Sequence, residues 1–268
     1  MNVEKARETL KNALENGGEV LKGYAGRVME ARIKETLSSV VTDADLAAEQ
    51  RILEILTGGR SPGNIISEEA GFLDHGSEYT WVVDPLDGTS NFAAGLPWYG
   101  VIIALFREAE LMLSGMLLPN EDQLYMAEGG RGARRNGHSI QASGSGKLAG
   151  QLIAYSFDHS DEQGKTEREM RTLAALSPQV RNIRSTNSLV DFCYVADGRL
   201  GAAVNQTTRI WDIAAATLLV KEAGGVVTDI HGNAMAFDLT RAAFEKNYTI
   251  VAAGAGLHPA LMKTITAF

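Results

Sequence analysis

The chain has 268 residues, of which 45% are hydrophobic and 22% are charged, a composition typical of a soluble globular protein with a large core. Its formal net charge of −8 disfavours nucleic acid and acidic membrane surfaces as partners, although a bound divalent cation would still admit a small anionic substrate. The single cysteine, Cys193, excludes an intramolecular disulfide. Since neither a secretory segment nor a membrane-spanning apolar run is evident, we expect a cytoplasmic protein.

The first part of the chain has the periodicity of two amphipathic helices. Apolar residues recur three, four or seven positions apart over 3–24, which predicts a helix interrupted near Gly17–Gly18. Thr42 and Asp45 have the spacing of a capping box and predict the start of a second helix. The expected apolar face of that helix consists of Leu46, Ile52, Leu53 and Leu56. We interpret the intervening segment, 34–41, as a loop or a short strand.

From Ile65 the pattern changes to short β-rich runs that are separated by Gly, Pro, Asn and Asp. These runs are 64–69, 79–84, 100–106, 111–118 and 123–128. Residues 107–110 are typical of a hairpin connection, and 129–140 continues as a turn and a strand. The pattern predicts a mostly antiparallel sheet that follows the two helices.

After about residue 146, strand-like and helical segments alternate. We expect strands at 151–156, 180–185, 201–206, 225–230 and 249–253, and helices at 161–176, 188–197, 212–223 and 257–266. This alternation predicts a layered α/β half. Because no repeat or long linker divides the chain, we expect 1–268 to form a single domain made of 1–145 and 146–268.

Three acidic clusters fall at the ends of these predicted elements. Glu68 and Glu69 end one strand, Asp84 and Asp87 end another just before Thr89, and Asp212 opens a helix. One interpretation is solvated acidic turns and a helix cap, where Asp is common. We favour a cation site, because burying several carboxylates after an apolar run is costly without a counter-charge.

The available ligands narrow the choice of metal. Carboxylates, carbonyls and water suit Mg²⁺, Mn²⁺ or Ca²⁺, whereas zinc and copper prefer His and Cys. The histidines lack ligand spacing, and we interpret them as surface or loop residues: His75, His138, His159, His231 and His258. Magnesium keeps positions open for phosphate oxygens, and two such ions can clamp a phosphoryl group. If a helix begins at Gly88–Thr89–Ser90, its amides can bind an anion beside that metal.

The single cysteine and a run of arginines are also considered as candidate functional residues. Cys193 lies in an apolar helical segment, and we interpret it as a core thiol rather than a nucleophile. Arg131, Arg134 and Arg135 are interpreted as part of a solvated hairpin, with contact to an anionic substrate as the alternative.

Two long motifs resemble a known family. "DPLDGTSNF" (84–92) and "WDIAAATLLVKEAGG" (211–225), with the upstream "SEE" (67–69), are similar to the inositol monophosphatase family of magnesium-dependent, lithium-sensitive phosphatases. The resemblance covers nearly the whole chain. It implies the layered α-β-α-β-α sandwich of the inositol monophosphatase/fructose-1,6-bisphosphatase type, two or three Mg²⁺ ions and commonly a homodimer.

The resemblance also implies roles for individual residues. The implied metal ligands are Glu68, Asp84, the Leu86 carbonyl, Asp87 and Asp212. Thr89 and Glu68 would orient and activate the attacking water, and Asp45 would hydrogen-bond the Thr89 hydroxyl. The amides of Gly88 and Thr89 would hold phosphate oxygens, and Lys34 matches a lysine of a loop near the metals. Glu69 would lie behind Glu68 without binding metal.

The chain departs from the family pattern at the wall that would contact the substrate alcohol. Asn205 stands where the inositol enzymes have a glutamate that binds sugar hydroxyls. Thr186–Asn187–Ser188 stands where Gly-Thr-Ala or Gly-Ser-Ala is expected. We therefore expect Asn187, Ser188, Asn205 and Asp212 to contact a substrate that is not restricted to myo-inositol.

The resulting hypothesis is a Mg²⁺-dependent phosphomonoesterase that acts on a small phosphorylated alcohol, with inositol 1-phosphate as the default. The alternatives with the same chemistry are 3′(2′),5′-bisphosphate nucleotidase, histidinol-phosphatase and fructose-1,6-bisphosphatase. A different class is a non-catalytic regulatory protein that binds a phosphate ligand.

Overall fold

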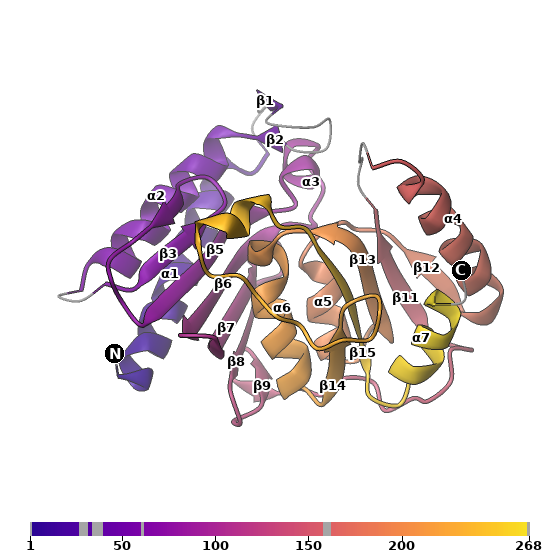
Figure 1. Ribbon diagram of the computed structural model, residues 1–268. Helices are drawn as coiled ribbons and strands as arrows, with labels where there is room; N and C mark the ends of the chain where they lie inside the picture. Colours follow the sequence, from indigo (N-terminus) through magenta and orange to yellow (C-terminus); the bar gives the residue numbers. More distant parts are fainter. Residues whose placement is uncertain (1, 27–31, 34–39, 60–61, 158–161, 267–268) are drawn as a thin grey trace.

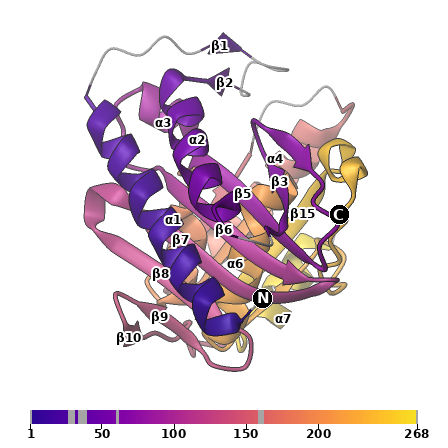
Figure 2. The same cartoon turned by 90° about the vertical axis from the view of Figure 1, so that its left-hand side faces the viewer.

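A computed structural model describes residues 2–26, 32–33, 40–59, 62–157 and 162–266. Its first half contains helices α1 (Val3–Tyr24) and α2 (Asp43–Thr57), which lie side by side on one face of an eight-stranded sheet (Figure 2). The strand order is β10-β9-β8-β7-β6-β5-β3-β4. The strands are β3 (Asn64–Ser67), β4 (Gly71–Leu73), β5 (Tyr79–Asp87), β6 (Gly100–Arg107), β7 (Glu110–Leu118), β8 (Gln123–Glu128), β9 (Ala133–Arg135) and β10 (His138–Ser139). All neighbours pair antiparallel except β3 and β5, which confirms the mostly antiparallel sheet.

The second half is built on a five-stranded sheet of order β12-β11-β13-β15-β14. Its strands are β11 (Leu152–Ser156), β12 (Asn182–Arg184), β13 (Ala202–Thr208), β14 (Gly225–Thr228) and β15 (Tyr248–Gly254). Its helices are α4 (Lys165–Leu176), α5 (Val190–Ala196), α6 (Ile210–Glu222) and α7 (His258–Ile265). Each element falls where the alternating pattern predicts it, with ends that differ by a few residues.

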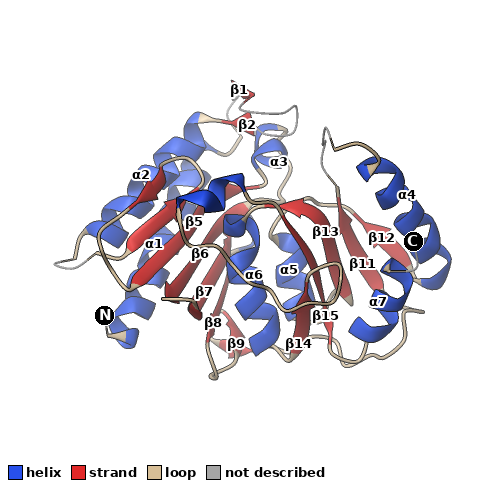
Figure 3. Ribbon diagram, in the orientation of Figure 1, coloured by secondary structure: helices blue, strands red, loops and turns tan. Residues whose placement is uncertain are grey.

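Five layers result, and three apolar clusters hold them together (Figures 1 and 3). One cluster joins α1 and α2 to the first sheet. The largest joins both sheets to α5 and α6, which lie between them, and the third joins α4 and α7 to the outer face of the second sheet. The expected α-β-α-β-α sandwich is therefore confirmed.

The short elements lie at the edges and connections of these layers. They are β1 (Arg32–Ile33), β2 (Val40–Val41), α3 (Thr89–Ala93) and the 3₁₀ turns Pro119–Glu121, Ser177–Gln179 and Arg241–Glu245. β1 and β2 pair antiparallel, and Lys34 lies outside the described residues. No helix in the described part of the chain is long and apolar enough to span a bilayer.

The predicted interruption of the first helix is wrong. α1 runs without a break through Gly17–Gly18, and both glycines are buried. A Cβ on Gly17 would lie 2.8 Å from Ile52 Cδ1 of α2, and one on Gly18 would collide with Leu117 of β7. The glycines therefore let α1 pack closely against its neighbours, and this packing outweighs their low helix propensity.

The second helix begins as predicted, with a reciprocal capping box between Thr42 and Asp45. Its expected apolar face is only partly correct, because Leu46 is 45% exposed whereas Ile52 and Leu56 are buried. The interpretation of the histidines as surface or loop residues is also wrong for His258, and His159 lies outside the described residues. His258 is buried in α7, where its ring lies 2.9 Å from the Thr228 hydroxyl.

Candidate metal and phosphate site

Three carboxylates from two distant parts of the chain meet between the two halves. Asp84 and Asp87 lie at the end of β5, and Asp212 lies in the first turn of α6. One oxygen of each lies within 4.8 Å of the others, and Asp84 is only 1% exposed. Within the described residues, this is the one group of three or more potential metal ligands found at such spacing.

The electrostatics of this cluster favour a cation. Burial raises the pKa of Asp87 well above its usual range, and the negative charges of Asp212 and Glu68 raise it further. The Leu189 amide, which donates a hydrogen bond to Asp87, acts in the opposite direction. A divalent cation among these oxygens would offset their repulsion. The all-oxygen donor set fits Mg²⁺ better than zinc or copper.

The backbone fixes the orientation of these carboxylates. The pairing of β5 with β6 shifts register between Asp84 and Asp87, and the Leu86 amide donates to Asp84 Oδ1 at 3.0 Å. Asp212 accepts from the Thr208 hydroxyl at 2.6 Å and from the Arg209 amide at 2.7 Å. It is the third residue of α6, so the sequence correctly predicts an acidic helix start.

The hydroxyl of Thr89 and the carboxylate of Asp45 lie beside the three aspartates, and the turn at Gly88 positions Thr89. Gly88 has φ +82°, and a Cβ there would lie 2.5 Å from the Trp98 carbonyl oxygen, so the turn before α3 requires glycine. Thr89 Oγ1 lies 2.9 Å from both Asp45 Oδ1 and the Leu86 carbonyl oxygen. Asp45 is buried, and its other oxygen accepts from Thr42 as the cap of α2.

Glu68 lies in the turn between β3 and β4, where its amide donates to the Val83 carbonyl at 3.2 Å. Its effect on the pKa of Asp87 places its charge near the cluster. Glu69, the next residue, is half-buried. The structure therefore brings the acidic groups of all three sequence clusters to one end of the fold.

The residues expected to contact the substrate alcohol lie on two neighbouring segments. Asn187 has φ +50°, and its side-chain amide donates to the Phe157 carbonyl at 2.9 Å. The Ser188 hydroxyl lies 3.2 Å from that of Thr186. Asn205, on β13, accepts from the Thr207 amide at 2.8 Å.

Two buried acids near the site are missed by the sequence motifs. Glu49 lies one turn after Asp45 on α2, and this four-residue spacing is the signal that could have found it. Asp191, on α5, accepts from the Ser156 hydroxyl at 3.1 Å. Burial raises the pKa of Asp191 to about 6, although the Thr186 and Ser156 hydroxyls partly offset that effect.

Cys193 is fully buried, and burial raises its thiol pKa well above the usual range, which agrees with a core role.

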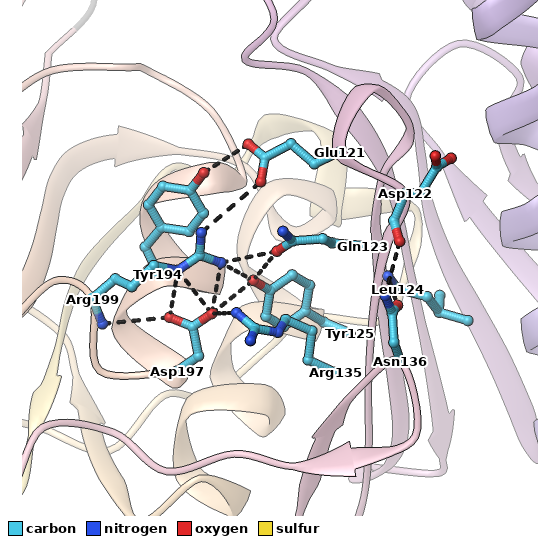
Figure 4. Close-up of polar contacts among 10 residues, drawn as sticks. All are labelled: Glu121, Asp122, Gln123, Leu124, Tyr125, Arg135, Asn136, Tyr194, Asp197 and Arg199. Carbon is cyan, nitrogen blue, oxygen red and sulfur yellow. Dashed lines mark hydrogen bonds and ion pairs between the residues drawn. The ribbon is translucent and has the colours of Figure 1, made fainter.

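Arg131 and Arg134 are exposed at the β9–β10 hairpin, as predicted. Arg135 differs, because its guanidinium binds Asp197 at 2.8 Å in a polar cluster with Tyr125 and Arg199 (Figure 4). No motif in the sequence predicts that cluster.

Comparison with known proteins agrees with this geometry. A model of the family described as the inositol monophosphatase family matches residues 2–267. The chain belongs to the inositol monophosphatase family. Membership implies a phosphatase hydrolase of a Mg²⁺-dependent family, and the three-aspartate group could hold such an ion.

Individual members of the family are also similar over most of the chain. A Nus factor SuhB from Pseudomonas aeruginosa is 37% identical over 198 residues, covering 72% of this chain and 73% of that protein. An inositol-1-monophosphatase from Mesorhizobium japonicum is 34% identical over 228 residues, covering 84% and 82%. The structure of the extragenic suppressor protein suhB from Bartonella henselae has a TM-score of 0.88 and 29% identity, covering 98% of this chain and 99% of that one.

Proposed function

We propose that the protein is a Mg²⁺-dependent phosphomonoesterase that hydrolyses a small phosphorylated alcohol, with inositol 1-phosphate as the default substrate. The observation that carries this proposal is the meeting of Asp84, Asp87 and Asp212 next to the hydrogen-bonded pair Thr89 and Asp45. Acidic ligands beside an oriented hydroxyl suit direct attack by water on a phosphate ester. Such a reaction requires no Cys or Ser nucleophile.

The residues that would hold two or three Mg²⁺ ions are Glu68, Asp84, the Leu86 carbonyl, Asp87 and Asp212. When bound, Mg²⁺ lowers the pKa of a coordinated water and neutralises charge on phosphate oxygens and on the leaving oxygen. The Leu86 carbonyl has two lone pairs, so the hydrogen bond from Thr89 does not prevent it from binding a cation.

Thr89 and Glu68 would orient and activate the attacking water. The single hydroxyl proton of Thr89 is shared between Asp45 and the Leu86 carbonyl, each 2.9 Å away. If the Leu86 carbonyl bound a cation, Asp45 would be the better acceptor for the Thr89 proton, and the lone pairs of the Thr89 hydroxyl would be available to the water. The amides of Gly88 and Thr89 would hold phosphate oxygens at the start of α3.

The wall formed by Asn187, Ser188 and Asn205, with Asp212, would contact the alcohol. Asn205 can donate to or accept from a hydroxyl, but it lacks the charge of the glutamate in the inositol enzymes. The alternatives with the same chemistry are therefore 3′(2′),5′-bisphosphate nucleotidase, histidinol-phosphatase and fructose-1,6-bisphosphatase. Because several relatives are named Nus factor SuhB, we retain a non-catalytic phosphate-binding protein as the alternative class.

We extend the proposal to the organisation of the protein. The large cluster shared by both sheets with α5 and α6 supports a single domain over 1–268. Family membership supports a homodimer, and the one buried thiol supports a cytoplasmic location. The expected partner is a small phosphorylated substrate rather than nucleic acid or a membrane.

The test is phosphate release with and without Mg²⁺ from inositol 1-phosphate, histidinol phosphate, fructose 1,6-bisphosphate, adenosine 3′,5′-bisphosphate and simple sugar phosphates. We expect Mg²⁺-dependent release, with one substrate clearly preferred. Asp84→Asn is the control for contaminating phosphatases. Equal release by wild type and Asp84→Asn would contradict the proposal, and no release by folded protein would favour the binding-protein alternative.

A further inference from the structure

Helix α2 presents two buried acids to the candidate site from one face. Asp45 and Glu49 are one helical turn apart, so their side chains lie on the same side of the helix. Asp45 is fully buried and Glu49 is 7% exposed. Asp45 contacts Thr89, whereas Glu49 contacts a different part of the site.

One oxygen of Glu49 accepts three hydrogen bonds from the end of β3 and from the turn that follows it. Its Oε1 accepts from the Ser67 hydroxyl at 2.6 Å, the Ala70 amide at 2.8 Å and the Glu69 amide at 3.2 Å. A carboxylate suits this task, because an ionised acceptor binds several N–H and O–H donors more strongly than a neutral one. These three donors flank Glu68 on both sides along the chain.

Glu68 is also held by the neighbouring strand β5. Its amide donates to the carbonyl of Val83, the residue that precedes Asp84 on β5. The chain around Glu68 is therefore hydrogen-bonded both to Glu49 of α2 and to the strand that carries Asp84 and Asp87. Loss of either support would change where the Glu68 carboxylate lies relative to Asp84 and Asp87.

We propose that Glu49 is a positioning residue for Glu68, and that α2 thereby sets the relative placement of the water-activating pair Thr89 and Glu68. This inference rests on the proposed function, in which Glu68 binds metal and activates water. Asp45 holds one member of the pair, and Glu49 holds the turn that carries the other. In this role, Glu49 acts through the turn that carries Glu68 and does not touch the substrate.

The experiment compares Glu49→Ala and Glu49→Gln with the wild type. We expect Glu49→Ala to lower kcat about 100-fold with little change in KM, because displacement of a reacting group by about 1 Å has effects of that size. It should also weaken Mg²⁺ binding 10- to 100-fold in calorimetry without substrate, since residues that support metal ligands have effects of this order. Glu49→Gln keeps an acceptor in place and should retain activity to within about tenfold.

Two controls separate positioning from general destabilisation. Glu54→Ala removes an exposed acid from the same helix, where it pairs with Arg51, and should leave kcat and Mg²⁺ affinity unchanged. Asp45→Ala should lower kcat but keep the Mg²⁺ affinity within about threefold, because Asp45 contacts Thr89 rather than the Glu68 turn. If Glu49→Ala does not fold, Ser67→Ala removes the shortest of the three hydrogen bonds and should give a smaller change in the same direction.

Wild-type kcat and Mg²⁺ affinity in folded Glu49→Ala, while Asp84→Asn is inactive, would overturn the positioning role and leave the proposed function standing. Full activity of Asp84→Asn would instead overturn the proposed function itself. A loss of activity in Glu49→Ala that Glu49→Gln largely restores, with reduced Mg²⁺ affinity in Glu49→Ala, would support the inference.

Discussion

Two acidic clusters lie at opposite ends of α5, and they differ in how their charge is balanced. At its first end, the Leu189 amide donates to Asp87, which shares its surroundings with Asp84 and Asp212. At its other end, Asp197 is 3% exposed and lies among cationic and phenolic side chains (Figure 4). The first cluster concentrates negative charge, whereas the second contains its own counter-charges.

The negative charge of Asp197 is offset by two arginines of the same cluster. Its carboxylate binds the guanidinium groups of Arg135 and Arg199 at 2.8 and 2.6 Å, and it accepts from the Tyr125 hydroxyl at 2.8 Å. The Arg199 guanidinium also lies 3.6 Å from the ring centroid of Tyr194. These contacts join the first sheet to the end of α5.

The difference distinguishes an acidic cluster that accumulates negative charge from one whose charge is offset within the protein. Around Asp87, burial and the neighbouring carboxylates Asp212 and Glu68 raise the pKa, and an external cation could offset their negative charge. Where arginines meet the carboxylate, as at Asp197, its charge is already offset within the protein, and we expect the cluster to stabilise the fold. Burial alone does not separate the two, because Asp84 and Asp197 are both largely inaccessible.

Asp84→Asn gives the sharpest test of this distinction. We expect turnover to fall at least about 10³-fold, because the loss of a metal ligand removes several kcal/mol of transition-state stabilisation. The protein should stay folded, since the substitution removes one of three mutually repelling charges. Phosphate release and circular dichroism check the two expectations, and Asp212→Asn should behave in the same way. Near-normal turnover would contradict the functional assignment of the cluster.

Asp197→Ala should show the opposite pattern. It leaves two guanidinium groups without their carboxylate, so we expect the free energy of unfolding to fall by about 3 kcal/mol, at the low end for a broken buried pair because the arginines are partly exposed. The kcat should stay within about threefold of wild type. Urea unfolding measures the loss, and Glu78→Ala, which breaks an exposed pair with Arg107, is the control and should lose much less stability.

Asp191 lies between the two clusters and allows a pH test. Its pKa is raised to about 6 in the folded protein, so the folded state binds the proton more tightly than the unfolded state. Its contribution to stability is therefore complete below about pH 4 and is lost as the pH rises through 6. The measurement is the difference in unfolding free energy between metal-free wild type and Asp191→Asn at each pH. Between pH 4 and 7 this difference should shift against the wild type by at most about 3 kcal/mol. A difference that does not vary with pH would contradict the raised pKa.

The smallest expected effect concerns substrate choice at Asn205. Asn205→Glu should raise kcat/KM for inositol 1-phosphate relative to the other substrates by a few-fold to tenfold, because a carboxylate is a stronger acceptor for sugar hydroxyls. The full substrate panel measures this ratio. An unchanged ranking would show that selectivity is set elsewhere in the wall, and Asn205→Gln tests whether side-chain length matters without charge.

The regular parts of the fold could be predicted because their patterns are local. The capping box at Thr42 and Asp45 and the short β runs after Ile65 depend on near neighbours in the sequence. The unbroken α1 could not be predicted, because the space that favours Gly17–Gly18 is made by Ile52 and Leu117 of other elements.

The candidate site also has a part that the sequence predicts and a part that it does not. Strand and helix ends predicted that Asp84, Asp87 and Asp212 would carry the chemistry, and the structure brings them together. The supports of the site are not visible in the motifs, because Glu49 acts across the fold on the turn at Ser67. The individual roles of the ligands and of the substrate wall stay predictions that the variants above test.

The placement of Asp212 on α6 has a consequence for synthesis of the chain. A ribosome produces Asp84 and Asp87 with the first sheet, but the helix that brings Asp212 to them follows much later. A nascent or truncated chain that stops before α6 therefore has only part of the carboxylate group, and it also lacks the helix that fills the space between the sheets. The three-carboxylate group thus exists only in chains completed beyond α6, and a truncation series scored for metal affinity would report when the two halves join.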